Sequence, residues 1–281
     1  MDELNYQWYD SNWLKYFNLA RRLIAQRFPA SLQDFEKSFD GLKTPSGFKT
    51  VKLDQFFDPA RLAQCRETIR ELDNAQLSVH ELLSFGRLVK HDLPGFSPLH
   101  AELAATLSEF AGEELAPSYN FLSLYNNLGV CEVHLDAPSS KWNVDVCIEQ
   151  SADWPIYISQ VVDWPDLPRD KSDRWAESIR HDPALSFDRF VQQPGDALFF
   201  SGSSQWHYRE RIPARAKQNY SHLVFFHFYP KGLETLIRPE CWADHFGISE
   251  LNEIARDIAA RPVYGIDGIS QTLAAQRDRS K

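Results

Sequence analysis

Cysteine is scarce in this chain of 281 residues, and its placement excludes two common uses of the residue. The four cysteines, Cys65, Cys131, Cys147 and Cys241, lie far apart, and no C-x-x-C pair occurs. Zinc knuckles and disulfide-stapled secreted domains need closely spaced cysteines. We therefore expect reduced thiols in a cytoplasmic protein. A chain of this length buries a core large enough to be stable without disulfide bonds.

The chain also has fewer basic than acidic residues, and it has no long apolar run. The 30 basic residues face 39 acidic ones, which gives a net charge of −9 at pH 7. Because phosphate binding needs clustered Lys and Arg, this balance argues against a nucleic-acid partner. The apolar run at 223–226 is far too short to cross a bilayer, and the first five residues, MDELN, lack the basic and apolar regions of a secretory signal. We expect no membrane partner.

The first third of the chain has helical periodicity. Apolar residues recur at i, i+3 and i+4 over 13–28, which predicts an amphipathic helix. Asp58-Pro59 and Ser97-Pro98 each combine an N-cap residue with a proline in the first turn. These two dipeptides predict two further helices.

After residue 117 the pattern changes to short strands. Alternating or apolar runs bounded by turn residues occur at 118–125, 142–148, 156–162, 197–200 and 223–229. Runs of this length and spacing are typical of a sandwich or barrel. We therefore predict an α+β fold, a double-stranded β-helix (jelly roll, cupin-like) with N-terminal helices packed on it.

The predicted organisation is a single domain over 1–281. Residues 1–116 form its mainly helical N-terminal part, 117–230 the jelly-roll core and 231–281 a C-terminal helical extension. The polar, proline-punctuated stretch 163–188 is expected to be an insertion between strands, with a short helix at 172–180.

The segment around His134 and Asp136 contains a His-x-Asp motif. Residues two apart on a strand point to the same side, so this imidazole and carboxylate can converge on one metal ion. A second His-x-acid pair, His100 and Glu102, falls in a helical stripe where i and i+2 diverge, and we expect a surface pair there. Further along, the turn and strand PGDALFF and the next segment WHYRE place His207 at the start of a strand.

Together these segments, over residues 118–229, resemble the iron(II)/2-oxoglutarate-dependent dioxygenase superfamily. His134, Asp136 and His207 match the metal triad of that family, a 2-His-1-carboxylate set. The resemblance implies Fe²⁺, 2-oxoglutarate and O₂ as cofactors, and a hydroxylase that releases succinate and CO₂. Because the carboxylate Asp136 is present, hydroxylation or a related desaturation, epoxidation or demethylation is favoured over halogenation.

The residues that would bind the tail carboxylate of 2-oxoglutarate are less regular. Family members place an Arg, or sometimes a Lys, beyond the distal His and two residues before a Ser. Here the position two before Ser221 is Asn219, which departs from the family pattern. Lys217 lies ten residues past His207, and Arg209 shares the face of that His if the strand continues. We rank these two cations equally.

Other candidates for the same site follow from the resemblance. Arg211 and Arg215 rank behind the first two cations. Tyr125, nine residues before the His-x-Asp motif, resembles the strand tyrosine that hydrogen-bonds 2-oxoglutarate in the family, and Ser123 shares its face. Ser221 is the hydroxyl partner that the family pattern supplies.

Three functions remain open at this point. The first is an oxygenase acting on a small metabolite or amino-acid-like substrate. The second is a protein side-chain hydroxylase of the same mechanism, which the spacing of Lys217 resembles. The third is a non-oxidative, cupin-like metal-binding protein, which the missing Arg before Ser221 favours.

Overall fold

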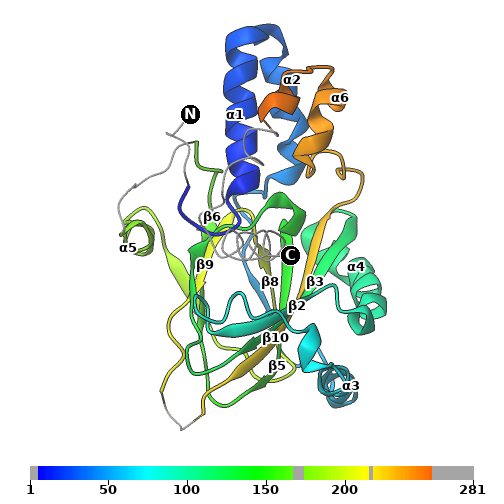
Figure 1. Cartoon of the computed structure of the whole chain (residues 1–281), viewed down its shortest axis with the longest axis vertical. Helices are drawn as coiled ribbons and strands as arrows, with labels where there is room; N and C mark the ends of the chain where they lie inside the picture. The colour runs from blue at the N-terminus through cyan, green and yellow to red at the C-terminus, as the bar shows by residue number, and fades with distance from the viewer. Residues whose placement is uncertain (1–5, 167–173, 215–217, 255–281) are drawn as a thin grey trace, which may run out of the picture.

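The computed structural model describes residues 6–166, 174–214 and 218–254, and its centre is a pair of antiparallel sheets (Figure 1). The six-stranded sheet has the order β1 (Val51–Leu53), β8 (Ala197–Ser201), β5 (Trp142–Gln150), β10 (Ser221–Pro230), β3 (Leu115–Tyr125) and β2 (Arg87–His91). The four-stranded sheet has the order β4 (Cys131–His134), β9 (Gln205–Arg209), β6 (Ile156–Val161) and β7 (Phe187–Phe190). Every predicted strand segment overlaps one of these strands, and the α+β class is confirmed.

Six α-helices accompany the sheets in the described part of the chain. They are α1 (Asn12–Arg27), α2 (Leu32–Ser38), α3 (Pro59–Arg70), α4 (Ser97–Ala111), α5 (Trp175–Arg180) and α6 (Trp242–Phe246). The three predicted helix starts are confirmed within one residue. At α3 the Asp58 side chain accepts a hydrogen bond of 2.8 Å from the Arg61 backbone N–H, as an N-cap does. None of the described helices is long and apolar enough to cross a membrane.

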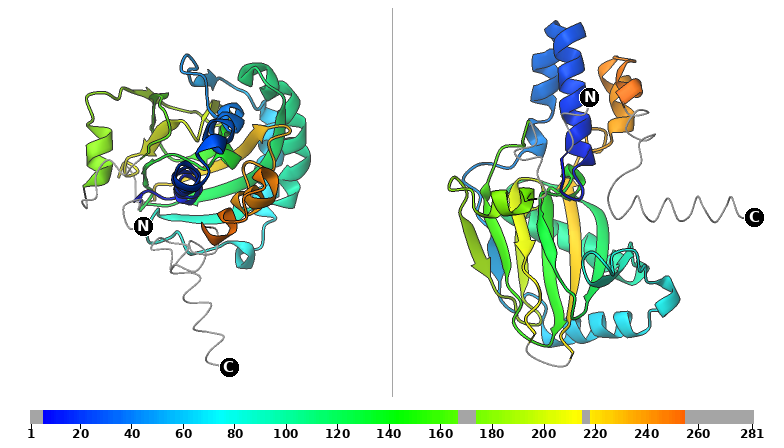
Figure 2. Two further views of the ribbon diagram at one scale, coloured as in Figure 1. Left: turned by 90° about the horizontal axis from the view of Figure 1, so that it is seen from above. Right: turned by 60° about the vertical axis from the view of Figure 1, so that its left-hand side comes forward.

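The helices cover two regions of the sheet pair. Helices α1, α2 and α6 stand at one end of the strands, where the apolar stripe of α1 packs into an aromatic cluster that includes Trp206 of β9 (Figures 1 and 2). Helices α3 and α4 pack on the outer face of the six-stranded sheet through Leu62 and Leu107, among others. The inner face of this sheet is thereby left for the four-stranded sheet.

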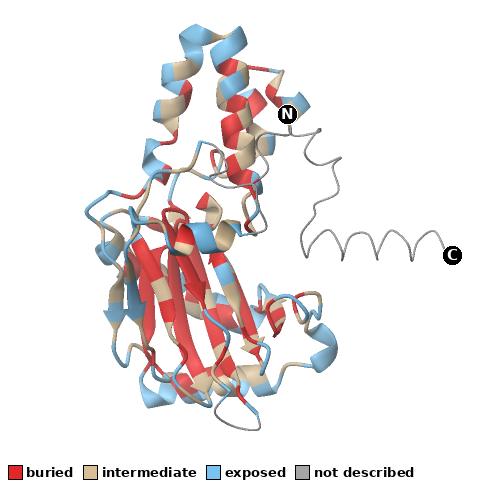
Figure 3. Cartoon of the chain, turned by 90° about the vertical axis from the view of Figure 1, so that its left-hand side faces the viewer, coloured by how far each residue is buried: buried red, intermediate tan, exposed pale blue. Residues whose placement is uncertain are grey.

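Strand β5 shows how the two faces of the large sheet differ. Trp142, Val144 and Val146 point outward into the core shared with α3 and α4. Asn143 and Asp145 alternate with them and face the space between the sheets, where they are almost fully buried. Buried residues run along the whole length of the inner strands (Figure 3). The space between the sheets therefore holds polar side chains as well as apolar ones.

The structure departs from the sequence-based expectation in two places. The N-terminal part contributes both edge strands of the large sheet, β1 and β2, in addition to its helices. The prediction that His100 and Glu102 form a surface pair is wrong for His100, which is buried. Because α4 packs on the large sheet, the His100 Nε2 reaches the backbone oxygen of His227 at 2.9 Å. The last part of the predicted C-terminal extension, 255–281, lies outside the described residues.

Candidate metal centre and its cavity

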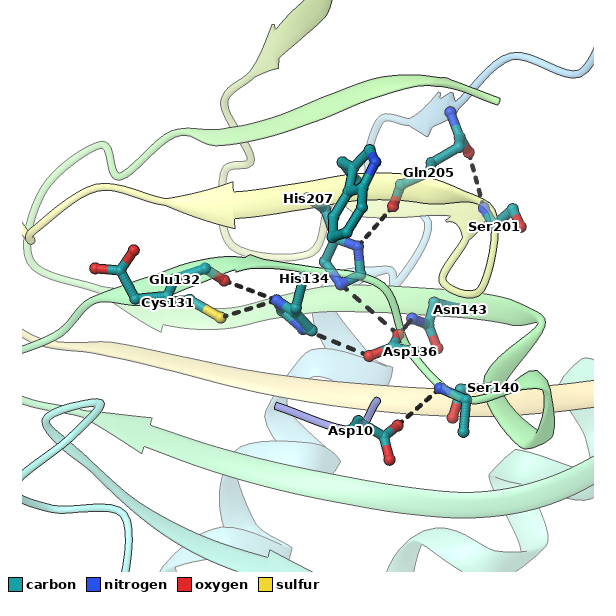
Figure 4. Close-up of polar contacts among 12 residues, drawn as sticks. Asp10, Cys131, Glu132, His134, Asp136, Ser140, Asn143, Ser201, Gln205 and His207 are labelled. Atoms are coloured by element: carbon teal, nitrogen blue, oxygen red, sulfur yellow. Dashed lines mark hydrogen bonds and ion pairs between the residues drawn. The ribbon is translucent and has the colours of Figure 1, made fainter. Parts of the chain in front are cut away.

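The predicted triad converges at one end of the small sheet (Figure 4). His134, the last residue of β4, lies opposite His207 of β9 in the strand register, and their ring centroids are 4.1 Å apart. Asp136 follows two residues later, in a loop held by a hydrogen bond of 2.9 Å from its backbone N–H to the Gly202 oxygen. One ligand atom from each of the three residues lies within 4.8 Å of the others.

Backbone contacts fix which ring nitrogen of each histidine faces the centre. The Nδ1 of His134 donates to the Glu132 carbonyl oxygen at 2.8 Å, and the Nδ1 of His207 donates to the Gln205 carbonyl oxygen at 2.9 Å. A carbonyl only accepts, so each neutral imidazole keeps its proton on Nδ1 and presents Nε2 to the centre. The two Nε2 atoms lie 3.4 and 3.7 Å from the carboxylate of Asp136. A hydrogen bond from Nδ1 to a carbonyl oxygen is the usual support of an imidazole that binds a metal through Nε2.

The carboxylate of Asp136 is positioned by two further residues. The Nδ2 of Asn143 donates to its Oδ2 at 2.6 Å. A Cβ at position 202 would collide with the same carboxylate oxygen and with the Asn143 amide, so Gly202 leaves the space in which both groups meet. The sequence analysis identified neither this contact nor the role of Gly202.

The charges of the three groups suit a divalent cation. Burial raises the pKa of Asp136, but the adjacent His207 and His134 outweigh it and hold that pKa well below its usual range. Two imidazoles this close do not both take up the second proton that makes a charged imidazolium. Burial and the neighbouring His134 lower the pKa of His207 to about 4. Burial also acts to lower the pKa of His134, but Cys131 and Asp136 raise it well above its usual value. A cation replaces that proton as the partner of the carboxylate.

The triad lies on the wall of a cavity that encloses about 570 Å³, including open solvent at its mouth. We call one part the arginine end; it is lined by Arg87, Tyr125, Cys131 and Arg209. We call the other part the imidazole end; it is lined by His91, Tyr119, Asn143 and His227. Tyr119 and Tyr125 are six residues apart on β3, so their backbones are about 20 Å apart along the strand. The side chains of the two ends approach each other through Phe121, whose ring contacts both Arg87 and His91. The metal ligands lie between them, since Cys131 adjoins His134 and Asn143 touches Asp136.

At the arginine end, Arg209 lines the same cavity as His207 but already has protein partners. One terminal nitrogen donates to the Asp145 carboxylate at 2.6 Å and to the Gln192 side-chain oxygen at 2.8 Å. The other donates to the Trp154 backbone oxygen at 2.7 Å. Asp145 is fully buried, and its second oxygen, Oδ1, has no hydrogen-bond partner among the described residues.

A second buried guanidinium, Arg87, was missed from the sequence. It pairs with Glu81 through Nε and donates from Nη1 to the Tyr125 hydroxyl at 2.6 Å. The rings of Phe85 and Phe121 flank its Cζ at 4.7 and 4.9 Å. The stretch RLVKH contains no recognisable motif, and only the pairing of β2 with β3 brings this arginine into the cavity.

The other residues predicted to bind the tail carboxylate of 2-oxoglutarate either do not line the cavity or lie outside the described residues. Ser221 and Ser123 are buried with no hydrogen-bond partner for either hydroxyl among the described residues, but neither lines the cavity. Arg211 is exposed and donates to the Leu128 backbone oxygen at 3.4 Å. Arg215 and Lys217 lie outside the described residues.

Comparison with known proteins gave structural neighbours only. No protein-family model and no curated protein sequence matches the chain. One similar structure is HygX from Streptomyces hygroscopicus with nickel and 2-oxoglutarate bound, with a TM-score of 0.49 and 15% identity over 70% of this chain and 86% of that chain. Another is the non-heme alpha-ketoglutarate-dependent epimerase SnoN from nogalamycin biosynthesis, with a TM-score of 0.48 and 16% identity over 74% and 89% of the two chains. A third is an oxidoreductase of the 2OG-Fe(II) oxygenase family from Burkholderia pseudomallei, with a TM-score of 0.45 and 14% identity over 81% and 94%.

Proposed function

We propose that the chain is an iron(II)- and 2-oxoglutarate-dependent oxygenase that uses O₂ to hydroxylate a small-molecule substrate, with release of succinate and CO₂. The observation that carries this proposal is the convergence of His134, Asp136 and His207, with both Nε2 atoms free and aimed at one carboxylate. Two imidazoles and one carboxylate occupy one face of a ferrous ion and leave positions open for ligands. When bound, the iron with its co-substrates would supply the oxidising chemistry.

The residues present fit that metal. The carboxylate is ionised, and the hydrogen bond from Asn143 leaves its other oxygen, Oδ1, directed to the Nε2 of His134. Backbone carbonyls hold both imidazoles in the tautomer that a metal needs. In the mechanism the chain itself positions these three ligands and buries them away from bulk water.

The arginine end is the proposed place for the tail carboxylate of 2-oxoglutarate. A bidentate guanidinium is the best partner for a carboxylate, and Arg209 lies two residues from His207 on the same face of β9. Arg87 adds a second guanidinium, and the Tyr125 hydroxyl between them can hydrogen-bond the same group. Ser221 and Lys217 remain proposed members of this site.

The N-terminal segment supports a small molecule over a peptide. The ring of Tyr9 lines the cavity and meets that of His134 edge-on, with centroids 5.5 Å apart. The neighbouring Asp10 side chain accepts a hydrogen bond of 2.8 Å from the backbone N–H of Ala137. The segment thus lies against His134 and the loop of Asp136, which favours a small molecule over a peptide.

We also propose that the two facing sheets form the double-stranded β-helix of a single catalytic domain. Residues 1–116 would supply helices and edge strands, 117–230 the jelly-roll core and 231–281 the C-terminal extension. The packing of Ile156 and Ile158 of the small sheet on Leu198 and Phe200 of the large sheet supports this arrangement.

The decisive experiment is an anaerobic titration of the purified protein with Fe²⁺ and 2-oxoglutarate, followed by visible absorption. We expect a charge-transfer band that is lost in His134→Ala, Asp136→Ala and His207→Ala. His222→Ala is the matched control, because His222 lies on β10 at an intermediate burial, away from the cavity lining. No band in the wild type, together with zinc or no metal in protein purified anaerobically, would favour the cupin-like, non-oxidative function instead.

A further inference from the structure

The imidazole end of the cavity is built as a row across neighbouring strands of the large sheet. Asn143 lies on β5, His227 on β10, Tyr119 on β3 and His91 on β2, and these four strands are adjacent in that order. The rings of Tyr119 and His227 stack with centroids 4.2 Å apart and an interplanar angle of 20°. The row begins at Asn143, which holds Asp136, and His227 on the adjacent strand is close enough to Asp136 for the two groups to interact electrostatically.

Two atoms of this row accept hydrogen bonds and have no donor among the described residues. The Nδ1 of His227 donates to the Tyr119 carbonyl oxygen at 3.3 Å, which leaves Nε2 with a lone pair. The amide Nδ2 of Asn143 is used by Asp136, and its Oδ1 is buried with no partner. Because a buried polar atom without a partner is costly, such a pair of acceptors favours a ligand that brings donors.

The charges around the cavity argue against an anionic group at this end. Among the described residues that line the cavity, the arginines are Arg87 and Arg209, and both belong to the other end. The proposed function uses that end for 2-oxoglutarate. The nearer of the two, Arg87, is already paired with Glu81 and the Tyr125 hydroxyl. A carboxylate or phosphate at the imidazole end would therefore meet lone pairs and ring faces, and no unpaired cation among the described lining residues.

We propose that the imidazole end binds an uncharged, hydroxyl-bearing substrate, which donates O–H groups to His227 Nε2 and Asn143 Oδ1. The parts of the Tyr119 and Phe121 rings that line the cavity then pack on the apolar part of the molecule. This inference rests on the proposed function, which assigns the arginine end to 2-oxoglutarate. It deepens that function by naming the substrate class. It disfavours free amino acids, which carry a carboxylate.

The test uses three probes of one shape: trans-cyclohexanediol, the matching hydroxy-carboxylate and the matching amino-alcohol. Their binding to the full-length protein is measured by saturation-transfer NMR, with zinc and 2-oxoglutarate present so that no turnover occurs, and again without both. We expect the diol to bind and the hydroxy-carboxylate to give no signal. Preferred binding of the hydroxy-carboxylate or of the amino-alcohol, or no binding of the diol, overturns the proposal.

Variants at His227 test the contact itself. His227→Phe keeps a ring to stack on Tyr119 but removes the acceptor, so it should weaken diol binding by about three- to tenfold, the usual effect of losing one hydrogen bond. His227→Gln keeps an acceptor near the position of Nε2 and should retain part of the affinity, which also controls for folding. His222→Phe, the same substitution at the His of β10 outside the cavity lining, should bind the diol as the wild type does. Equal diol binding by His227→Phe and wild type overturns the assignment of this residue.

The outcome separates this inference from the proposed function. Diol binding that depends on His227, without any succinate formation or charge-transfer band, would retain the hydroxyl site and refute the oxygenase. A charge-transfer band together with preferred binding of the hydroxy-carboxylate would support the oxygenase and refute the hydroxyl site.

Discussion

Arg87 and Tyr125 lie opposite each other on neighbouring strands, and the guanidinium donates to the phenol oxygen at 2.6 Å. This contact joins an edge strand of the N-terminal part to the wall of the cavity. The buried guanidinium pairs with the buried carboxylate of Glu81, and this ion pair fixes the position of Arg87. The arrangement makes a prediction that separates the structural role of the pair from a role in binding.

Replacing Arg87 with Met should destabilise the protein by about 3–5 kcal/mol, because it removes the guanidinium from the buried Glu81 carboxylate and leaves His80, at 3.5 Å, as its ionisable neighbour. The double variant Arg87→Met, Glu81→Gln should recover most of this loss. Its affinity for 2-oxoglutarate should still be reduced by about tenfold or more, because the cation is gone. Urea unfolding measures the first effect and calorimetric titration with 2-oxoglutarate the second. Normal 2-oxoglutarate binding by the double variant would remove Arg87 from the tail site.

Gly202→Ala should impair metal binding with little effect on the sheets. The added Cβ collides with the Oδ2 of Asp136 and with the amide of Asn143, so the carboxylate has to move. Displacing a contact that orients a metal ligand typically costs about 10–100-fold in metal affinity. Gly47→Ala is the matched control, because a Cβ there meets nothing within 4 Å. Zinc affinity by competition with a chelator is the measurement, and equal affinity in both variants contradicts the proposed arrangement.

Acid should destabilise the protein through His227. Burial lowers the pKa of this group from 6.5 to about 4, so between these values the unfolded chain binds a proton that the folded chain does not. Stability therefore falls as the pH falls through this range, by about 1.4 kcal/mol per pH unit for one such group. Gln at position 227 does not titrate. In His227→Gln the free energy of unfolding should therefore fall less steeply between pH 6.5 and 4, by about 1.4 kcal/mol per pH unit. Urea unfolding across this pH range measures it, and parallel curves for the two proteins would contradict a neutral, buried imidazole.

The sequence predicted which three side chains come together better than it predicted the cavity around them, and the reason is the range of the interactions involved. His134 and Asp136 are only two residues apart in the chain, so they stay close although Asp136 lies in the loop after β4. His207 required only the position of a turn and a strand start. Arg87 enters the cavity through the pairing of β2 with β3, which joins segments from different parts of the chain. No local pattern encodes that pairing.

Burial by tertiary packing explains the remaining differences. His100 was expected on the surface with Glu102, because residues i and i+2 of a helix diverge and cannot share a metal ion. The packing of α4 on the large sheet instead placed its ring against the backbone of β10. Asn143 alternates with Val144 along β5, but its contact with Asp136 depends on the path of the loop that carries the carboxylate. Parity along a strand gives the face on which a side chain lies, and only the assembled sheets determine what it meets there.

Metal binding should stabilise the wild-type protein and have no such effect on Asp136→Asn. A ligand that binds only the folded state stabilises it by about 2.7 kcal/mol when its free concentration is one hundred times its Kd. Asn at this position keeps the shape of the side chain but loses the negative charge, which Asp136 supplies as an ionised group in a buried site. We therefore expect the melting temperature of the wild type to rise with added zinc and to return when a chelator is added, while that of Asp136→Asn stays constant. Asp188→Asn, on the exposed strand β7, is the control and should respond as the wild type does. An equal zinc response in all three proteins would mean that the ion binds elsewhere, and the triad would lose its assignment as the metal site.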